Sequence, residues 1–294
     1  MAQLSDDCFA FGGPLIGLDA ALTLLLERTA PVTGVETAPL AAARGRVLAE
    51  DIVAPRDVPP HDNSAVDGYA VYFDDLAPGA ETALPVKGRA AAGHPLAGAQ
   101  ARATAVRIFT GAPMPPGADG TQAGGPDTVL MQEDCAETDG VVRVPPGLKR
   151  GANRRKRGED IKAGAIILRA GRRLKPQDIG LAASIGLTRV PVRQPLRVAL
   201  FSTGDEIREP GTPAPAGAVY DANRFALLAA LQGLGCSVTD LGILPDRFAT
   251  IRDALAGAAA AHDLILTSGG MSTGDEDHIT PAVRVVAPGR FHGQ

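Results

Sequence analysis

The chain has 294 residues, of which 45% are hydrophobic and 21% charged, so it can form two domains or one elaborate one and is not disordered. Its net charge of −4 gives no electrostatic footprint for nucleic-acid binding, and no apolar run is long enough to cross a bilayer. Three cysteines without CxxC spacing, and an acidic amino terminus without the apolar segment of a signal peptide, favour a cytoplasmic protein.

The amino-terminal part is expected to be helical and extended. Leu18, Leu22 and Leu25 recur at helical spacing, which predicts a helix that ends before Pro31. A second helix is predicted over residues 38–48, where apolar residues again fall on one face. Neither segment carries residues suited to chemistry, so both are interpreted as core or interface helices.

A polar cluster follows a proline-rich approach in the next part of the chain. Asp62, Asn63, Ser64 and Asp67 place several donors and acceptors close together before GYAV at 68–71, which is typical of a strand. A turn rich in aspartate and asparagine explains such a cluster without any function. A substrate-binding loop is the functional alternative.

Residues 77–148 contain short apolar segments separated by glycines, which predicts a β-rich domain. Within it, prolines and glycines stiffen the loop at 107–119, with Thr110 at its mouth. Residues 120–127, GTQAGGPD, are expected to be a loop extension.

The run at 151–164 is the most densely charged part of the chain. Four cations at 154–157 lie beside Glu159 and Asp160. A solvated face or a nucleic-acid patch is the ordinary explanation. Because the protein is acidic and guanidinium groups bind phosphate oxygens in pairs, a polyanionic small molecule is favoured. A short helix is predicted next, within 174–187.

From residue 196 onward, strand and helix patterns alternate. Strands are predicted at 196–201, 238–243 and 264–268, and helical spacing predicts helices at 223–234 and 250–261. This order indicates a parallel, doubly wound sheet with right-handed crossovers.

Polar residues and glycines follow each of these strands, and parallel strands bring such residues to one edge of a sheet. Clustered carboxylates need a cation, and hydroxyls and free amides suit phosphate, so Mg²⁺ bridging acids and phosphate explains both. Glycine-rich turns with solvated acids are the alternative. A zinc site and a nucleophilic serine are disfavoured, because neither ligand spacing nor a GxSxG elbow occurs. The residues in question are Ser202, Thr203, Gly204, Asp205, Glu206, Asp246, Ser268, Gly269, Gly270, Ser272, Asp275 and Asp277.

Eight segments, in order along the chain, resemble the molybdopterin molybdenumtransferases, the molybdenum insertases related to the enzymatic domain of gephyrin. They are PHDNSAVDGYAV, RIFTGAPMPPGAD, VLMQED, GANRRKRGEDIKAG, LFSTGDEI, VYDANR, LGILPDR and LTSGGMSTGDED, and the resemblance covers about 18–277. It implies a multi-domain fold, α/β plus β-rich. The expected domains are a helical or extended one at 1–55 and 149–193, a β-rich one at 56–148 and a molybdopterin-binding α/β domain at 194–294.

The resemblance also implies an activity and a set of residues. Such a homodimer would insert molybdenum from molybdate into adenylylated molybdopterin and release AMP with Mg²⁺. By motif, the expected catalytic residues are Asp62, Thr110, Asp160, Glu206, Asp246 and Asp277, the last three as metal ligands. Residues 202–205, Ser268, Gly269, Gly270, Ser272 and Asp275 are expected to bind the pterin. Contact with the molybdopterin adenylyltransferase is a further expected interaction.

The chain departs from the family pattern in three places. Arg154 stands where the family has an apolar residue, 120–127 is an insertion, and the family's later proline-glycine loops are missing before the end at Gln294. A carboxyl-terminal region is therefore expected to be absent, and the alternative function is a non-catalytic molybdopterin-binding fragment or scaffold. The sister adenylyltransferase shares the TSGG-type sheet domain but lacks the DNSAVDGYA and GEDI regions, which disfavours that assignment.

Overall fold

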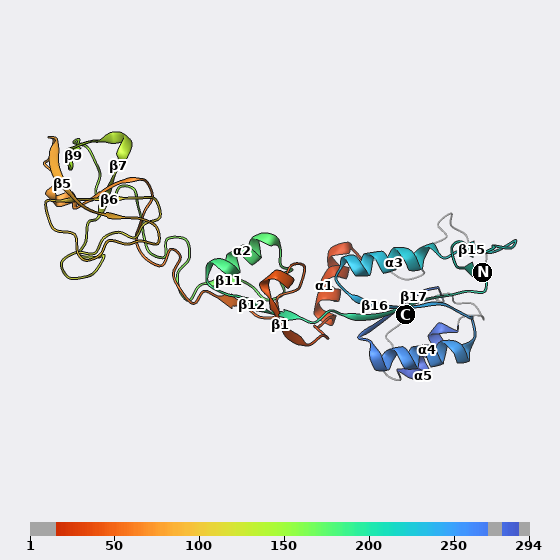
Figure 1. Cartoon of the computed structure of the whole chain (residues 1–294). Coiled ribbons are helices and arrows are strands. Elements are labelled where there is room, and N and C mark those ends of the chain that lie inside the picture. Colours follow the sequence, from red (N-terminus) through yellow and green to blue (C-terminus); the bar gives the residue numbers. More distant parts are fainter. Residues whose placement is uncertain (1–15, 270–277, 288–294) are drawn as a thin grey trace. The chain divides into compact units, whose positions relative to one another are not determined.

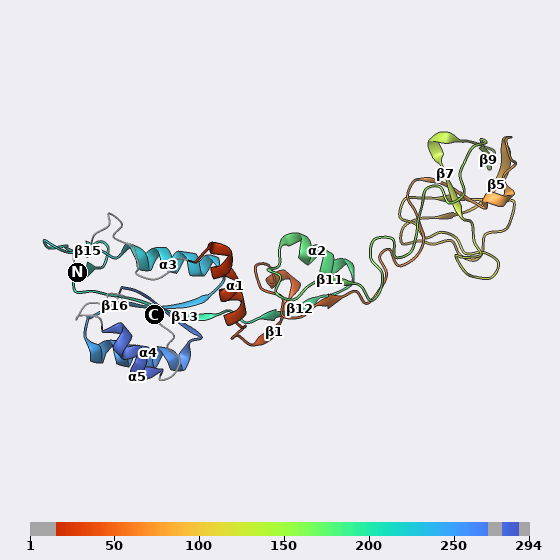
Figure 2. The same ribbon diagram turned by 180° about the vertical axis from the view of Figure 1, so that it is seen from behind.

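The computed structural model describes residues 16–269 and 278–287. The chain divides into two compact units, one of residues 1–36 with 193–294 and the other of residues 37–192. Figures 1 and 2 show the elements of both units from opposite sides. No helix in the described residues is long and apolar enough to span a membrane.

The first unit is built on parallel strands β13 (Arg197–Thr203), β16 (Ser237–Leu244) and β17 (Leu264–Ser268). β13 lies between the other two, and its residues from Val198 onward are buried. Such a strand reads as an unbroken apolar run because parallel sheets are covered on both faces. This confirms the predicted parallel arrangement.

Helices cover the two faces of this sheet. α3 (Ala222–Gly233) lies on one face, and α4 (Phe248–Ala261) and α5 (Ile279–Val286) lie on the other, as both views show (Figures 1 and 2). Phe201, Ile251 and Leu255 form part of the core between β13 and α4. The helices and strands predicted from residue 196 onward are therefore confirmed.

Two further parts of this unit do not belong to the parallel sheet. The short strands β14 (Ile207–Arg208) and β15 (Val219–Tyr220) pair in parallel between β13 and α3. The predicted amino-terminal helix is α1 (Leu18–Arg28), and none of its residues is buried.

The second unit contains a mixed sheet with the strand order β7-β4-β6-β5-β9-β8 in the described residues. Along β4, Tyr69 and Val71 pack in one apolar cluster and Ala70 in another, so both faces of the sheet are covered. This confirms the predicted β-rich region. The bounds are β4 (Gly68–Val71), β5 (Thr82–Ala90), β6 (Ala105–Ile108), β7 (Thr128–Met131), β8 (Ala136–Thr138) and β9 (Val141–Val144), with 3-10 turns η2 (Phe73–Asp75) and η3 (Gln132–Asp134).

A separate apolar cluster of this unit surrounds α2 (Pro176–Ser184), the helix predicted within 174–187. Leu48, Ile185 and Val192 are fully buried in it. The strand pairs are β1 with β12, β2 with β11 and β3 with β10. Their bounds are β1 (Val35–Pro39), β2 (Ile52–Val53), β3 (Asn63–Ser64), β10 (Arg154–Arg155), β11 (Ile166–Leu168) and β12 (Arg189–Arg193).

The helix predicted over 38–48 is wrong. β1 ends at Pro39, the 3-10 turn η1 (Leu40–Ala42) follows, and Leu48 forms an antiparallel bridge with Val192. Gly45 adopts φ 78°, a left-handed conformation that interrupts any right-handed helix. The apolar pattern did mark buried residues, but the backbone that buries them is extended. The division into three domains stays a prediction.

Candidate functional site

The carboxyl ends of the parallel strands form the first part of the candidate site. Ser202 of β13 is the register partner of Ser268 of β17, and Thr203 is the partner of Leu244, the last residue of β16. Strands β13, β16 and β17 therefore end side by side. Their last residues, and the residues directly after them, include the predicted residues 202–206, Asp246 and 268–269. The edge that the sequence predicted is confirmed for these strands.

Three side-chain hydroxyls at this edge are buried and make no hydrogen bond of normal geometry to the described residues. Among the described residues, Ser202 Oγ, Thr203 Oγ1 and Thr267 Oγ1 have no hydrogen-bond partner of normal geometry. Ser202 is 2% and Thr203 5% exposed. A buried, unpaired hydroxyl costs about 1–3 kcal/mol, so three of them together suggest groups kept for a ligand.

Gly204 and Gly269 at this edge stand where a side chain would collide with neighbouring atoms. A Cβ on Gly269, whose φ is 104°, would lie 2.7 Å from the carbonyl oxygen of Thr203. A Cβ on Gly204, at φ 145°, would lie 2.7 Å from a carboxylate oxygen of Glu206. The positive φ at both positions, and the close backbone contact at Gly269, therefore favour glycine.

The predicted acids are only partly described. Asp205 and Glu206 are exposed and Asp246 is half-buried. No group of three metal-ligating side chains occurs in residues 16–269 and 278–287. The remaining predicted residues, Gly270, Ser272, Asp275 and Asp277, lie outside the described residues, so the predicted Mg²⁺ site stays a prediction.

A buried ionic cluster lies beside the hydroxyls. The side chain of Arg224, 4% exposed, pairs with the carboxylates of Asp221, Glu209 and Asp240. Burial raises the pKa of Asp221, but hydrogen bonds from Arg224 outweigh it and hold that pKa below its usual value. Ser202 Oγ also helps to lower this pKa, although it makes no hydrogen bond of normal geometry.

Sequence reasoning gave this cluster no role. Asp221 and Arg224 belong to VYDANR, one of the segments that carry the family resemblance. Asp221 caps α3 by accepting the Arg224 N–H at 3.1 Å, and its carboxylate binds the Arg224 guanidinium at 2.9 Å. The sequence could have indicated this cluster, because Asp221 stands just before a predicted helix, where aspartate often caps the helix, and Arg224 follows three residues later.

In the second unit, Thr110 is held by Asp67, a member of the polar cluster that was not among the predicted catalytic residues. Its backbone N–H and its Oγ1 donate to the same carboxylate oxygen of Asp67, at 2.7 and 2.8 Å. The backbone bond first, and the hydroxyl second, lower the pKa of Asp67. Asp67 thus fixes the Thr110 side chain.

Asp62 lies beside the basic run at 154–157. Its Oδ1 accepts the backbone N–H of Arg157 at 2.7 Å, and its Oδ2 lies 3.5 Å from the guanidinium of Arg154. β3 and β10 bring these segments together, since Arg154 is the register partner of Ser64. Arg154 therefore faces a predicted catalytic carboxylate.

The other two arginines of this run are paired as well. Arg155 binds Asp160 at 2.5 Å and Glu159 at 3.1 Å. The predicted residue Asp160 is thus one half of an exposed ion pair. Arg157 binds Asp57, whose pKa is lowered chiefly by the N–H of Ala163 and then by Arg157. The run is consequently a chain of ion pairs.

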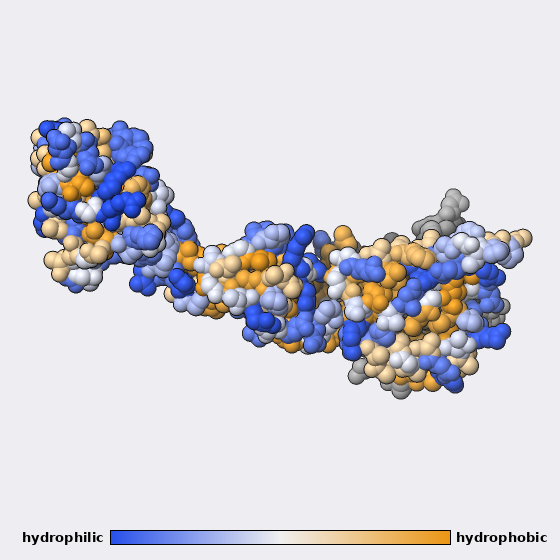
Figure 3. Space-filling view, in the orientation of Figure 1, coloured by the Kyte–Doolittle hydropathy of each residue, from blue (hydrophilic) through white to orange (hydrophobic). Residues whose placement is uncertain are grey.

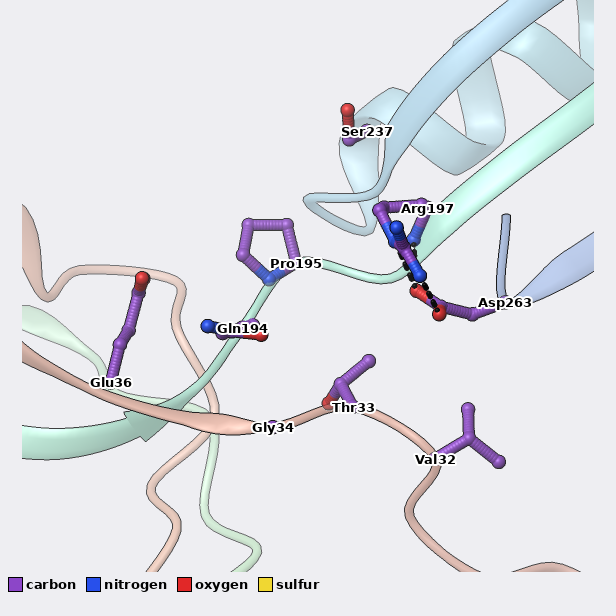
Figure 4. A pocket seen from close by; sticks show the side chains of 9 residues that line it. All are labelled: Val32, Thr33, Gly34, Glu36, Gln194, Pro195, Arg197, Ser237 and Asp263. Carbon is purple, nitrogen blue, oxygen red and sulfur yellow. Dashed lines mark hydrogen bonds and ion pairs between the residues drawn. The ribbon is translucent and has the colours of Figure 1, made fainter. Parts of the chain in front are cut away.

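A pocket of about 510 Å³ lies at the other edge of the parallel sheet. Arg197 begins β13, Ser237 begins β16 and Asp263 directly precedes β17, so the pocket opens at the amino ends of the strands. Figure 4 shows hydrogen bonds between Arg197 and Asp263, two of the residues that line it. None of the predicted site residues lines it.

Comparison with known proteins gives matches along most of the chain. The model of the MoeA N-terminal region (domain I and II) matches residues 16–186, and that of a probable molybdopterin-binding domain matches residues 199–292.

Individual relatives agree with these matches. The molybdopterin molybdenumtransferase of Haemophilus influenzae is 38% identical over 94% of this chain and 66% of its own length. Molybdopterin molybdenumtransferase 2 of Mycobacterium tuberculosis is 37% identical over 81% of this chain and 58% of its own length. The chain thus spans less than two thirds of each of these relatives.

Solved structures agree too. The crystal structure of the molybdopterin biosynthesis MoeA protein from Pyrococcus horikoshii OT3 matches 87% of this chain and 67% of its own, with a TM-score of 0.78 and 31% identity.

Proposed function

The chain belongs to the MoeA family, and from this premise we propose that it inserts molybdenum from molybdate into adenylylated molybdopterin. The reaction cleaves the phosphoanhydride bond to the adenylate, with water supplying the oxygen that AMP or the pterin phosphate gains. One molybdate oxygen then leaves as water with the two dithiolene thiol protons while both sulfurs bind molybdenum. No electron is transferred in this sequence.

The unpartnered hydroxyls at the carboxyl edge of β13 and β17 carry the proposal. Ser202 Oγ and Thr203 Oγ1 are buried, make no hydrogen bond of normal geometry to the described residues and lie where parallel α/β sheets bind ligands. Hydroxyls and the amides beside Gly204 and Gly269 are groups that bind phosphate oxygens. We assign the phosphate end of the pterin to this edge.

The acids that follow the strands suit Mg²⁺. Mg²⁺ prefers carboxylate oxygens and usually takes one or two of them together with substrate phosphates. Glu206 follows β13 and Asp246 follows β16, so both come from the proposed phosphate edge. When bound, the ion would neutralise charge on the phosphates. In the second unit, Asp67 would orient the Thr110 hydroxyl for contact with the substrate. Asp62 and Asp160 would be the catalytic carboxylates of this unit.

AMP release tests this proposal. The purified chain, incubated with adenylylated molybdopterin, molybdate and Mg²⁺, is expected to release AMP, and Asp246→Ala is expected to reduce the rate about 100-fold or more. Asp253→Asn is the matched control, because Asp253 is exposed on α4 and pairs only with Arg252 in the described contacts. Release that needs no Mg²⁺, or equal rates in both variants, would contradict the proposal.

A molybdopterin-binding module is the second candidate function, because the model of a probable molybdopterin-binding domain matches residues 199–292. Tight binding of the pterin without AMP release would identify a molybdopterin-binding module.

We further propose a cytoplasmic homodimer. Leu18, Leu25 and Leu26 of α1 are 75%, 59% and 78% exposed, and Figure 3 shows apolar surface in orange over α1. A second copy of the chain would remove this surface from water. Sedimentation is expected to give twice the monomer mass for the chain and the monomer mass for Leu25→Glu. Monomers in both would overturn the proposal.

A further inference from the structure

We propose that Gln122 is a positioning residue, which fixes the backbone of Asp62 and thereby aims its carboxylate. The inference rests on the proposed function for the importance of Asp62. The sequence marks residues 120–127 as an insertion without a role, so no role had been expected for Gln122.

The side-chain amide of Gln122 is fully used in contacts with the main chain. Its Oε1 accepts the N–H of Asp62 at 3.0 Å, and its Nε2 donates to the carbonyl oxygen of Asp62 at 3.0 Å. The second N–H of Nε2 donates to the carbonyl oxygen of Met114 at 2.9 Å. One amide therefore pairs with both backbone groups of Asp62, as a residue of a neighbouring strand would.

Other contacts complete the support of Asp62. Its carbonyl oxygen also accepts the N–H of Met114 at 2.8 Å, and its Oδ1 accepts the N–H of Arg157 at 2.7 Å. Backbone and carboxylate are thus both held. The Arg154 guanidinium lies 3.5 Å from the Oδ2 of Asp62. Gln122 is the member of this set whose side chain holds the Asp62 backbone, and substitution removes that contact.

The loop that carries Gln122 is closed by its own contacts. The carboxylate of Asp119 accepts the N–H and the Oγ1 of Thr121 at 2.9 and 2.8 Å. The N–H of Gly117 donates to the carbonyl oxygen of Thr121 at 2.8 Å. A Cβ on Gly117 would lie 1.9 Å from the carbonyl oxygen of Gly124, so this turn requires glycine. Contacts within the loop therefore hold its conformation in addition to its contacts with Asp62.

A purely structural role for Gln122 makes a different prediction. If the amide only attached the loop to the domain, its loss would lower stability and reduce turnover equally with or without the Asp62 carboxylate. If it acts through Asp62, its loss has no further effect once that carboxylate is gone.

The first test does not depend on activity. Gln122→Met keeps the length of the side chain and removes all its hydrogen bonds to Asp62. Hydrogen exchange of the Asp62 backbone N–H is expected to accelerate about tenfold or more. Gln132→Met is the matched control, because among the described residues the Gln132 side-chain amide binds only the side chains of Arg107 and Glu133. Equal protection of the Asp62 N–H in the chain and in Gln122→Met would overturn the contact.

The second test is a double-mutant cycle in AMP release. Gln122→Met is expected to lower kcat about tenfold or more with little change in KM, since misplacing a reacting group acts on the chemical step. In an Asp62→Asn background it is expected to cause no further loss. An equal loss in both backgrounds would overturn the positioning role. A chain that releases no AMP would refute the proposed function and with it that role, while the exchange measurement would still decide the contact.

Discussion

At the scale of single residues, the guanidinium of Arg224 holds together charges from three segments of the first unit. Asp221, 3% exposed, depends on it most, whereas Glu209 is 47% exposed and shares its charge with water. Removing the arginine leaves a buried carboxylate without a partner, which is costly in any protein. The cluster therefore stabilises the region beside the unpartnered hydroxyls.

Arg224→Met is expected to lower the free energy of unfolding by about 3 kcal/mol, because Asp221 stays buried and loses its partner. Arg143→Met is the control, since the Arg143–Glu81 pair is 59% and 54% exposed. A pair in water contributes less than about 1 kcal/mol. Urea unfolding of both variants measures the difference, and equal losses would contradict the account.

A second residue-scale prediction concerns pH. Hydrogen bonds from the Arg197 side chain, and then from its backbone N–H, lower the pKa of Asp263 from 3.8 to about 2. A depressed folded-state pKa stabilises the fold above the unfolded value and loses this effect as pH falls through the folded value. The stabilising contribution is therefore complete above about pH 4 and disappears toward pH 2.

Urea unfolding of the chain and of Asp263→Asn between pH 5 and pH 2 tests this expectation. The difference in unfolding free energy between them should shrink as the pH falls. A difference that stays constant or grows would show that Asp263 does not titrate as the geometry implies.

Single residues were predictable where local pattern and position coincide. Ser202 and Thr203 could be found because they close an apolar strand. Asp67 was visible in a polar cluster, but its contact with Thr110 spans 43 residues and leaves no local pattern. Gln122 meets Asp62 across 60 residues from a glycine-rich segment without periodicity, so sequence reasoning had nothing to indicate it.

At the scale of elements, the pairing of β4 with β7 in the mixed sheet depends on a glycine. Gly68 lies in β4, and a Cβ there would come 1.7 Å from the carbonyl oxygen of Leu130 in β7. The two strands cannot keep their register against such a clash. Gly68 is thus required by close approach of two backbones.

Gly68→Ala is expected to destabilise the second unit by about 3 kcal/mol or more, because strand β7 must shift. Gly180→Ala in α2 is the matched control, since its Cβ would meet no atom within 4 Å. That substitution is expected to stabilise by up to about 1 kcal/mol, as alanine is favoured within helices. Urea unfolding distinguishes them, and equal effects would contradict the packing described.

Elements were predictable where the spacing of apolar residues was regular. β13 and β17 each show an apolar run, and α3 and α4 each show helical spacing. The segment 38–48 has helical spacing too, yet Pro39 ends a strand and Gly45 is left-handed. Spacing alone could not reveal that partners distant in sequence, such as Val192, draw this segment into an extended form.

At the scale of the whole molecule, the predicted residues fall into both units. Asp62, Thr110 and Asp160 lie in the unit of residues 37–192, and Glu206 and Asp246 lie in the other. Only the family resemblance joined them into one site, because no pattern in the sequence relates segments so far apart. That union stays a prediction, whereas the neighbouring strand ends within the first unit are confirmed.

The central claim is that the unpartnered hydroxyls at the carboxyl edge of the sheet bind the phosphate end of molybdopterin. Calorimetric titration of molybdopterin with Mg²⁺ into Thr203→Val tests it most directly. Valine keeps the shape of threonine and removes an unpaired buried hydroxyl, so the free protein should be as stable or more stable while affinity falls about tenfold. Ser237→Ala, at the opposite edge of the sheet, should bind like the unaltered chain. Unchanged affinity in Thr203→Val, or weakened binding only in Ser237→Ala, would contradict the account.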